Sequence, residues 1–589
     1  MKINKLRPVY FLPLFLVLVL YGCYSVRSYR KTENLDRMFS ILLSPETLEP
    51  ADWILLKSYS RNELLDYMET WSPGRRNAAF KILELNGLEY PDRTEAASGI
   101  NRSPGSRKES SEGLILQQAE EFYLLRDYEA SEKAYREYWF NQVHNSETLP
   151  PPVLLGNIRN TVVRSSEAST WISILNDWKG FSRSGFGGSF FLASCYETAS
   201  RPEEAVYWYE QSAIRSGNLE EIRRAQWYVI RLLSRERPDR LPAFLYGSGR
   251  LRNEGAYFDD VIDEYYSTLV RSRRWKELQE LVPALEAAGL KEAAVQGQFL
   301  LTKAVESGYA RRDEHSYAYS MDEADPRGYI ALRTFPDQWP LREQNPGSAD
   351  SYPSDNDEFY RVLMSAGYEK EALGLLQENR ETVSAETVAE FARFMESEGD
   401  LYELIRFAGY WFYRLPPEEG MKLLPWVFPG AGRYAVADEI VPEELILGVI
   451  RRESAFHEGI SSRVGAGGLM QLMPATADDL ARRHRMEDWD LMNPEDNITL
   501  GTLYLHWLID RPWTDSYVDV LAAYNGGGGN LRTWKRRFGS SDPDLFIQSI
   551  PFRETRDYVR KVIVAAASYR YLDTGLPPGE WLDQFYQSF

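Results

Sequence analysis

The chain contains little cysteine and histidine, and it has fewer basic residues (68 Lys and Arg) than acidic residues (87 Asp and Glu). Only 2 of its 589 residues are cysteine and 5 are histidine. Two cysteines cannot build a disulfide framework or a zinc cage, and no histidine falls in a His-Glu-x-x-His pattern, so we expect no metal and no cofactor. The net charge of −19 argues against nucleic acid as a partner. The glycine run 526–529 is not followed by Lys-Ser/Thr, which disfavours a nucleotide site.

The N-terminus has the pattern of an export signal. Basic residues precede a short apolar stretch at positions 9–21. The sequence Leu20-Tyr21-Gly22-Cys23 resembles a bacterial lipoprotein processing site. We therefore predict that residues 1–23 are a signal, that Cys23 is lipidated, and that the exported protein is held at a membrane of the cell envelope. The alternative is an uncleaved anchor, although the stretch is short for a membrane span.

The length and the spacing of apolar residues predict several helical domains. A chain of 589 residues is too long for one core. We expect a helical region at 24–93, a Ser/Gly-rich linker at 94–113, and an irregular α-solenoid of helical hairpins at 114–430 with a polar break at 344–357. The all-α chain would end in a second α domain at 431–589. Solenoids usually present interaction surfaces, so envelope proteins are possible partners of this region.

One carboxylate lies on the apolar face of a predicted helix. In the segment 441–456, Ile446, Val449 and Ile450 follow the spacing of a core-facing stripe, and the next position of that stripe is Glu453. Partial burial would raise the pKa of this carboxyl, as a general acid requires near neutral pH. The alternatives are a buried ion pair with an arginine, or a helix that turns Glu453 toward solvent.

Four sequence blocks lie within residues 435–572, and the first of them contains this glutamate. They are Glu453-Ser454, Gly465-Ala466 with Gly468-Leu469-Met470-Gln471, Ala523-Tyr524-Asn525, and Glu554-Thr555-Arg556 with Tyr558-Val559. In this order and spacing they resemble the catalytic domain of the soluble lytic transglycosylase family. The resemblance implies a lysozyme-like α fold for the C-terminal domain. Larger members of the family also carry a helical superhelix upstream.

The resemblance further implies an activity on peptidoglycan. The family cleaves the β-1,4 bond between N-acetylmuramic acid and N-acetylglucosamine without water and leaves a 1,6-anhydro sugar. Most glycosidases use two carboxylates, whereas this family uses one. By position, Glu453 would protonate the glycosidic oxygen and then take the proton of the C6 hydroxyl, while the substrate's 2-acetamido group stabilises the reacting carbon.

The resemblance also suggests residues that bind the sugar chain. Ser462 aligns with a serine near the catalytic glutamate, and Glu554 aligns with a glutamate of the groove. The remaining aligned groove residues are Met470, Gln471, Tyr524 and Asn525. Each residue has a purely structural alternative. Met470 and Tyr524 could be core residues, Asn525 part of a helix-ending turn, and Glu554 one half of a surface ion pair with Arg556.

The chain departs from the family pattern in its glycine run. Gly526 and Gly528 replace the usual alanine and proline, from which we expect a more mobile loop. Gly467 also replaces a side chain that is often larger. No proton-transfer group is lost, so we predict an active enzyme. Two alternatives stay open, namely a hydrolytic muramidase in which water attacks, and a non-catalytic envelope scaffold that binds peptidoglycan.

Overall fold

The structure is a computed structural model of the whole chain. It describes residues 111–589 except 147–148, 248–250, 252–256, 312–324, 326, 341–353, 380, 431, 435–437 and 540–541. Before residue 111 it describes the helix 73–85 and the single positions 38–39, 43, 64, 68 and 71. The predicted signal with Cys23, and nearly all of the predicted linker 94–113, lie outside the described residues. None of the described helices has the length and apolar character needed to cross a membrane.

The contacts within the chain divide it into two units, which we describe separately. The first unit joins residues 1–100 to residues 345–427, and the second joins residues 101–344 to residues 428–589. The second unit therefore contains the upstream helical hairpins together with the whole C-terminal domain. The sequence-based boundaries at 114, 430 and 431 stay predictions.

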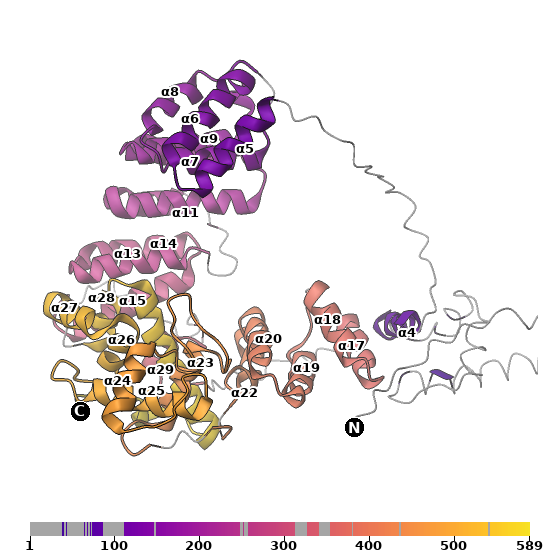
Figure 1. Ribbon diagram of the computed structural model, residues 1–589, viewed down its shortest axis with the longest axis vertical. Helices are drawn as coiled ribbons and strands as arrows, with labels where there is room; N and C mark the ends of the chain where they lie inside the picture. The colour runs from indigo at the N-terminus through magenta and orange to yellow at the C-terminus, as the bar shows by residue number, and fades with distance from the viewer. Residues whose placement is uncertain are drawn as a thin grey trace, which may run out of the picture. The chain divides into compact units, whose positions relative to one another are not determined.

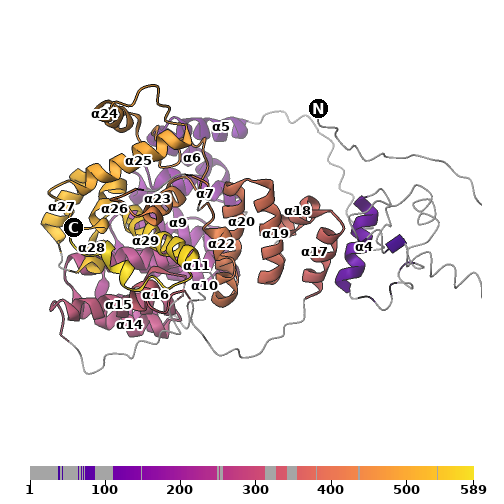
Figure 2. The ribbon, with the colours of Figure 1, turned by 90° about the horizontal axis from the view of Figure 1, so that it is seen from below.

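The first unit is built of short antiparallel helices, which lie side by side in Figures 1 and 2. Its helices are α4 (Pro73–Leu85), α17 (Asp355–Ser365), α18 (Glu369–Asn379), α19 (Ala385–Glu398), α20 (Leu401–Arg414), α21 (Pro417–Met421) and α22 (Leu424–Val427). The carboxylate of Asp357 ties two helix starts together, because it accepts hydrogen bonds from Ser354 in the capping box of α17 and from Ser384 at the N-cap of α19. These bonds lower the pKa of Asp357 to about 2, although its burial opposes the shift.

The hairpins of the second unit share one apolar core. They are α5 (Ser111–Leu124), α6 (Tyr128–Tyr138), α7 (Pro152–Val162), α8 (Ala168–Asn176), α9 (Gly185–Thr198), α10 (Pro202–Ile214), α11 (Leu219–Glu236), α12 (Leu241–Gly247), α13 (Asp259–Arg271), α14 (Trp275–Ala287), α15 (Lys291–Glu306) and α16 (Tyr329–Thr334). Three short helical turns are 139–143, 181–183 and 238–240. The buried core runs from Ala119 to Ala304, so stacked hairpins bury a continuous interior as expected for a solenoid.

The C-terminal domain is also helical. It comprises α23 (Glu443–Glu453), α24 (Pro474–His484), α25 (Pro494–Ile509), α26 (Tyr517–Gly526), α27 (Gly528–Phe538), α28 (Pro543–Ser549), α29 (Arg553–Thr574) and a last turn at 579–585. In the described ranges no β-strand occurs, and only isolated bridges join Gly467 to Ser461 and to Leu472. The predicted all-α class, hairpins followed by an α domain, is confirmed.

Two features of this domain determine how its helices are placed. Gly448 lets α23 approach α29 closely, because a Cβ at this position would lie 3.0 Å from the carbonyl oxygen of Val562. The hairpins also continue into the domain, since Leu545 of α28 belongs to their apolar core. In Figure 1, α13 and α15 lie beside α28, which both helices contact. The upstream hairpins therefore form one wall of the C-terminal domain.

Candidate active site

Glu453 is the last residue of α23, and its side chain is largely buried. Burial is the main cause that raises the pKa of its carboxyl from 4.5 to about 7, and the nearby Glu554 raises it further. Tyr558 and Arg452 act in the opposite direction. A carboxylate at the C-terminal end of a helix also faces the negative end of the helix dipole. The arrangement keeps Glu453 protonated close to neutral pH, as the apolar stripe predicts.

The ion-pair alternative for Glu453 finds no support in the structure. Among the described residues, no lysine, arginine or histidine forms a salt bridge with its carboxyl. The arginine beside it in sequence, Arg452, is exposed and influences the pKa only through its charge. The carboxyl thus remains available to a molecule that enters from solvent.

Tyr558 of α29 is the partner of Glu453 that the sequence analysis did not assign. Its ring is fully buried, and its hydroxyl has no hydrogen bond of ordinary length and angle among the described residues. Burial and the charge of Glu453 raise the pKa of this phenol well above its ordinary value, so Tyr558 stays a proton donor. Such a hydroxyl can stabilise the glutamate when it is ionised. In the sequence, Tyr558 could have been recognised from its position in the fourth sequence block.

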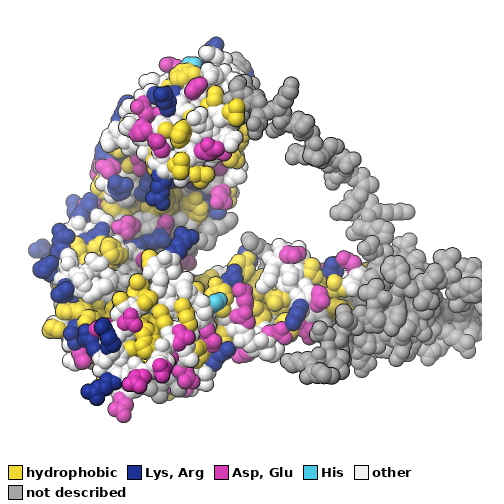
Figure 3. All heavy atoms as spheres, in the orientation of Figure 1, with side chains coloured by type: hydrophobic (Ala, Val, Ile, Leu, Met, Phe, Trp, Pro, Cys, Tyr) yellow, Lys and Arg dark blue, Asp and Glu magenta, His cyan; other side chains and the backbone are white. Residues whose placement is uncertain are grey.

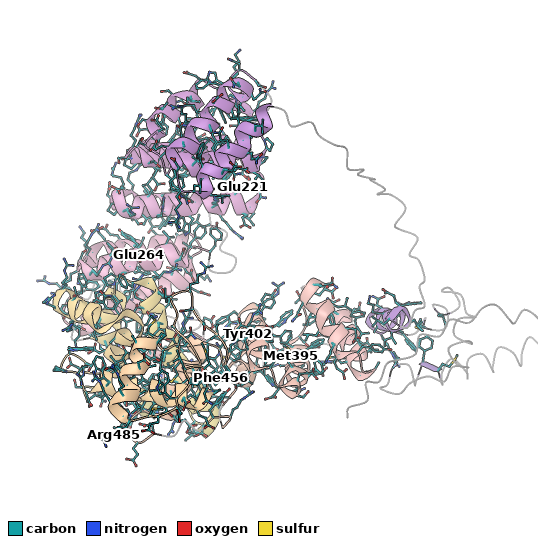
Figure 4. The ribbon with its side chains drawn as sticks, viewed as in Figure 1. Glu221, Glu264, Met395, Tyr402, Phe456 and Arg485 are labelled. Carbon is teal, nitrogen blue, oxygen red and sulfur yellow. The ribbon has the colours of Figure 1, made fainter. Side chains whose placement is uncertain are left out.

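The chain turns sharply after Glu453. Ala455 and Phe456 have φ angles of 49° and 63°, in the left-handed region that residues other than glycine rarely adopt. Two contacts hold this turn, since the Phe456 amide donates to the Ser454 hydroxyl at 3.1 Å and the Phe456 ring packs against Gly430. Figure 4 labels Phe456 beside the start of the following loop. The strained turn ends α23 and leads the chain into the loop 461–472.

Ser462 and Gln471 hold this loop in shape. The Ser462 hydroxyl accepts a hydrogen bond from the Ala466 amide at 2.9 Å. Gln471, with a φ of 47°, donates from its side-chain amide to the carbonyl oxygens of Ile460 and Gly468 at 3.0 and 2.8 Å. Both residues are partly exposed, so their remaining polar atoms can contact a ligand.

Met470 connects the loop to two helices through its backbone. Its amide donates to Asn497 of α25 at 2.7 Å, and its carbonyl accepts from the Tyr524 hydroxyl of α26 at 2.7 Å. The Met470 side chain is fully buried and packs closely on Gly501, so it offers no exposed surface in this structure. Asn497, which also donates to Gly467 and Leu491, is a buried positioning residue that sequence reasoning missed.

Asn525 and Glu554 lie where α26 ends and α29 begins. The Asn525 side-chain oxygen accepts a hydrogen bond from the Thr555 hydroxyl at 2.6 Å, which ties the two helices together. Glu554 is exposed, and its charge reaches Glu453. The rings of Tyr524 and Tyr558 lie parallel, with centroids 6.4 Å apart. The structure therefore gathers the predicted residues of α26 and α29 around one carboxyl.

Comparison with known proteins identifies this part of the chain. Residues 433–547 match the model of the family described as "Transglycosylase SLT domain". The C-terminal domain belongs to this family. The soluble lytic murein transglycosylase of Escherichia coli K12 is 39% identical over 144 residues, which are 24% of this chain and 22% of the relative. The chain therefore spans only about a fifth of the length of that relative.

Two further proteins are similar to this chain. The membrane-bound lytic murein transglycosylase C of Histophilus somni is 31% identical over 178 residues, which are 26% of this chain and 47% of the relative. The structural alignment with the crystal structure of the 70 kDa soluble lytic transglycosylase from Escherichia coli covers 95% of this chain and 100% of that protein's chain. The sequence identity is 16% and the TM-score is 0.42.

The glycine run of the SLT domain is a helix junction. Gly526 ends α26, Gly528 begins α27, and only Gly527, with a φ of 84°, lies outside both helices. A Cβ at Gly526 would lie 2.5 Å from the Trp534 ring, and a Cβ at Gly528 would lie 2.6 Å from the Trp513 ring. Because the two indoles fill the space of the missing side chains, the expected mobile loop is replaced by a tightly packed turn.

Arg556 of the fourth sequence block anchors the SLT domain to the hairpins. It is fully buried, and it bonds to Asp263 of α13 at 2.8 Å and to Glu264 at 2.8 Å. Asp263 also accepts hydrogen bonds from Arg560 and Gln296. The arginines hold the pKa of Asp263 well below its ordinary range, against the effect of burial. The surface pair of Glu554 with Arg556, offered as an alternative from sequence, does not form.

Proposed function

We propose that the SLT domain cleaves the bond between N-acetylmuramic acid and N-acetylglucosamine in peptidoglycan, with Glu453 as acid and then base. The observation that carries this proposal is a largely buried carboxyl at the C-terminal end of α23, with a pKa of about 7 and no ion pair among the described residues. A neutral carboxylic acid close to neutral pH is the group needed to protonate a leaving glycosidic oxygen. The relatives named above support the choice of substrate.

Glu453 gives up one proton and takes up another within one catalytic cycle. The protonated carboxyl donates to the glycosidic oxygen while the bond from that oxygen to C1 breaks and its electron pair stays on the oxygen. The 2-acetamido group of the sugar stabilises the electron-poor C1. The Glu453 carboxylate then removes the proton of the C6 hydroxyl as O6 bonds to C1. Between the two steps, the Tyr558 hydroxyl can donate a hydrogen bond to the carboxylate.

The surrounding residues would orient the sugar chain. Ser462, Gln471, Asn525 and Glu554 are partly or fully exposed and lie on the elements that meet at Glu453. Tyr524 is half-buried, with its hydroxyl engaged by the loop, so its ring face is the part that can contact a sugar. Met470 contributes by fixing the loop between α25 and α26.

Mass spectrometry of the products released from purified peptidoglycan tests the proposal. We expect 1,6-anhydro ends from the wild-type protein and none from Glu453→Gln. Glu443→Gln, at the exposed start of the same helix, is the matched control and should retain activity. Reducing ends in place of anhydro ends would establish the hydrolytic muramidase instead. Binding without any release would support the scaffold.

The pH dependence gives a second readout of the same residue. Because Glu453 must start the reaction protonated, the rate should fall as the pH rises through its folded pKa of about 7. A wild-type rate that stays constant between pH 6 and 8 would contradict the assignment of Glu453 as the acid.

We also propose that the N-terminus anchors the enzyme in the cell envelope through a lipid on Cys23. The basic and apolar pattern of residues 1–23 supports this placement. In a bacterial host, the wild-type protein should sediment with membranes, and Cys23→Ser should either release it or leave an unprocessed signal. A mature wild-type protein whose N-terminus carries no acyl mass would contradict lipidation. Contacts of the hairpins with envelope proteins would be retained in the wild-type protein and in Cys23→Ser.

A further inference from the structure

Helix α27 of the SLT domain carries basic residues and no acidic one. The basic residues are Arg532, Lys535, Arg536 and Arg537. Leu531 and Trp534 are buried and pack the helix onto the domain, whereas the three arginines are exposed. In Figures 1 and 2 α27 lies at the outer edge of the domain, and Figure 3 shows lysine and arginine side chains gathering over it. The arginines form a basic face on a chain whose net charge is −19.

The three arginines of this basic face have no carboxylate partner. Among the described residues, no aspartate or glutamate forms an ion pair with any of them. Lys535 of the same helix differs, because its ammonium group donates to Asp515 and Asp519. The dipole of α27 favours cations in its last turn, where Arg536 and Arg537 lie, but it gives no reason for Arg532. The basic face therefore offers guanidinium groups to an anion from outside the chain.

Aromatic side chains flank the basic face. The Arg532 guanidinium lies 6.0 Å from the ring centroid of Trp513, and the Trp513 ring contacts that of Trp507 with centroids 6.4 Å apart. The Phe552 ring packs on Trp534 of α27 with centroids 5.3 Å apart, and Phe552 is 49% exposed. Guanidinium groups bind phosphate in a bidentate manner, and aromatic rings beside them suit the boundary between headgroups and acyl chains. This combination matches the surface of an anionic phospholipid membrane.

The position of α27 is tied to that of the residues around Glu453. The helix follows α26, which carries Tyr524, after the single residue Gly527. Because two indole rings fill the space beside the glycines on either side of Gly527, this junction is tightly packed. A surface that binds α27 therefore also fixes the orientation of the candidate active site relative to that surface.

We propose that the basic face of α27, together with Trp513 and Phe552, binds an anionic phospholipid surface and orients the SLT domain beside the membrane. The inference rests on the proposed lipid at Cys23, which would keep the chain within reach of the headgroups. At such a high local concentration, contacts of a few charges suffice. The net charge of −19 repels most of the chain from the same surface, so the basic face is the side that turns toward it.

Co-sedimentation of the processed full-length protein with vesicles tests this contact. Vesicles of phosphatidylcholine alone are compared with vesicles of phosphatidylglycerol and phosphatidylcholine in equal amounts. An acyl anchor binds both kinds, so only the excess binding to the anionic vesicles reports on the basic face. We expect this excess at an ionic strength of about 0.1 M, where the Debye length is about 10 Å, and its loss at about 1 M, where that length is about 3 Å.

Substitutions in the basic face should lower the excess in steps. Arg536→Gln should reduce it about fivefold, and Arg536→Gln combined with Arg537→Gln about 25-fold, because each arginine near an anionic surface contributes about a factor of five. Both side chains are exposed, so the variants should fold and should cleave solubilised peptidoglycan at the wild-type rate. Arg126→Gln, at an exposed arginine on the turn between α5 and α6, is the matched control and should keep the full excess.

Three results would overturn the inference. The first is equal binding of the wild-type protein to both kinds of vesicle, and the second is an excess that persists in the double variant. The third is a double variant that binds vesicles normally but loses retention on purified peptidoglycan, which would assign the basic face to carboxylates of the cell wall. Failure of the anchor looks different. A processed protein without an acyl group on Cys23 would no longer bind phosphatidylcholine vesicles, whereas its excess on anionic vesicles would remain.

Discussion

The raised pKa of Glu453 predicts that removing its charge stabilises the protein. A shift from the ordinary value of 4.5 to about 7 corresponds to about 3 kcal/mol of unfavourable free energy when the folded carboxyl ionises. The amide of Glu453→Gln has nearly the same shape and never ionises. At pH 8 the variant should therefore be more stable than the wild-type protein by up to about 3 kcal/mol.

The sign of this effect depends on pH. Below pH 4.5 the carboxyl is protonated in both the folded and the unfolded chain, so it contributes no difference. Between pH 4.5 and 7 the unfolded carboxyl ionises while the folded one remains neutral, and the folded protein loses stability progressively. Above pH 7 the loss is constant. The advantage of the variant should be absent at pH 4 and complete at pH 8.

Hydrogen exchange of the α23 amides measures this effect locally, which matters because a chain of two units need not unfold in one step. Wild type and variant are compared at the same pH, so intrinsic exchange rates cancel. Glu443→Gln on the first turn should show instead a small loss of about 0.3–1 kcal/mol at pH 8, because it removes a negative charge from the N-terminal end of the helix. An advantage of Glu453→Gln that is equal at pH 4 and pH 8 would refute the reasoning.

Other consequences of the packing can be tested by thermal unfolding. Gly528→Ala would place a methyl group against the Trp513 ring and should cost about 1–3 kcal/mol, whereas Gly529→Ala, with open space around it, should be neutral or stabilising; equal effects would contradict the packed turn. Arg556→Met should cost about 3–5 kcal/mol because it leaves Asp263 short of one cation, and a loss below 1 kcal/mol would contradict the anchor. The lowered pKa of Asp263 also means that its contribution is present above pH 3.8 and is lost as the pH falls through its folded pKa, so acid unfolding should begin at a higher pH in Arg556→Met.

Local sequence determined much of the candidate site. The apolar stripe of α23 placed Glu453 at the boundary of the core, because residues that share a helix face share an environment. The order of four short blocks was enough to identify the family of the C-terminal domain.

Where local pattern was insufficient, the missing information lay in distant residues. Four glycines in a row predict a mobile loop, yet Trp513 and Trp534 fill the space around them. A buried asparagine at position 497 cannot be recognised as a loop anchor until the loop folds onto α25. The same holds for Tyr558, which faces Glu453 only because Gly448 lets α23 and α29 approach closely.

By itself, the sequence determined the helical class, the position of the acidic residue on its helix and the family of the C-terminal domain, since these depend on periodicity and on residues close together in the chain. Only the tertiary structure decided that Arg556 binds Asp263, almost 300 residues earlier, and that α11, α13 and α29 enclose a charged cavity. An ion pair and a cavity depend on which side chains contact each other in space, and the periodicity of apolar residues does not specify contacts between distant parts of the chain.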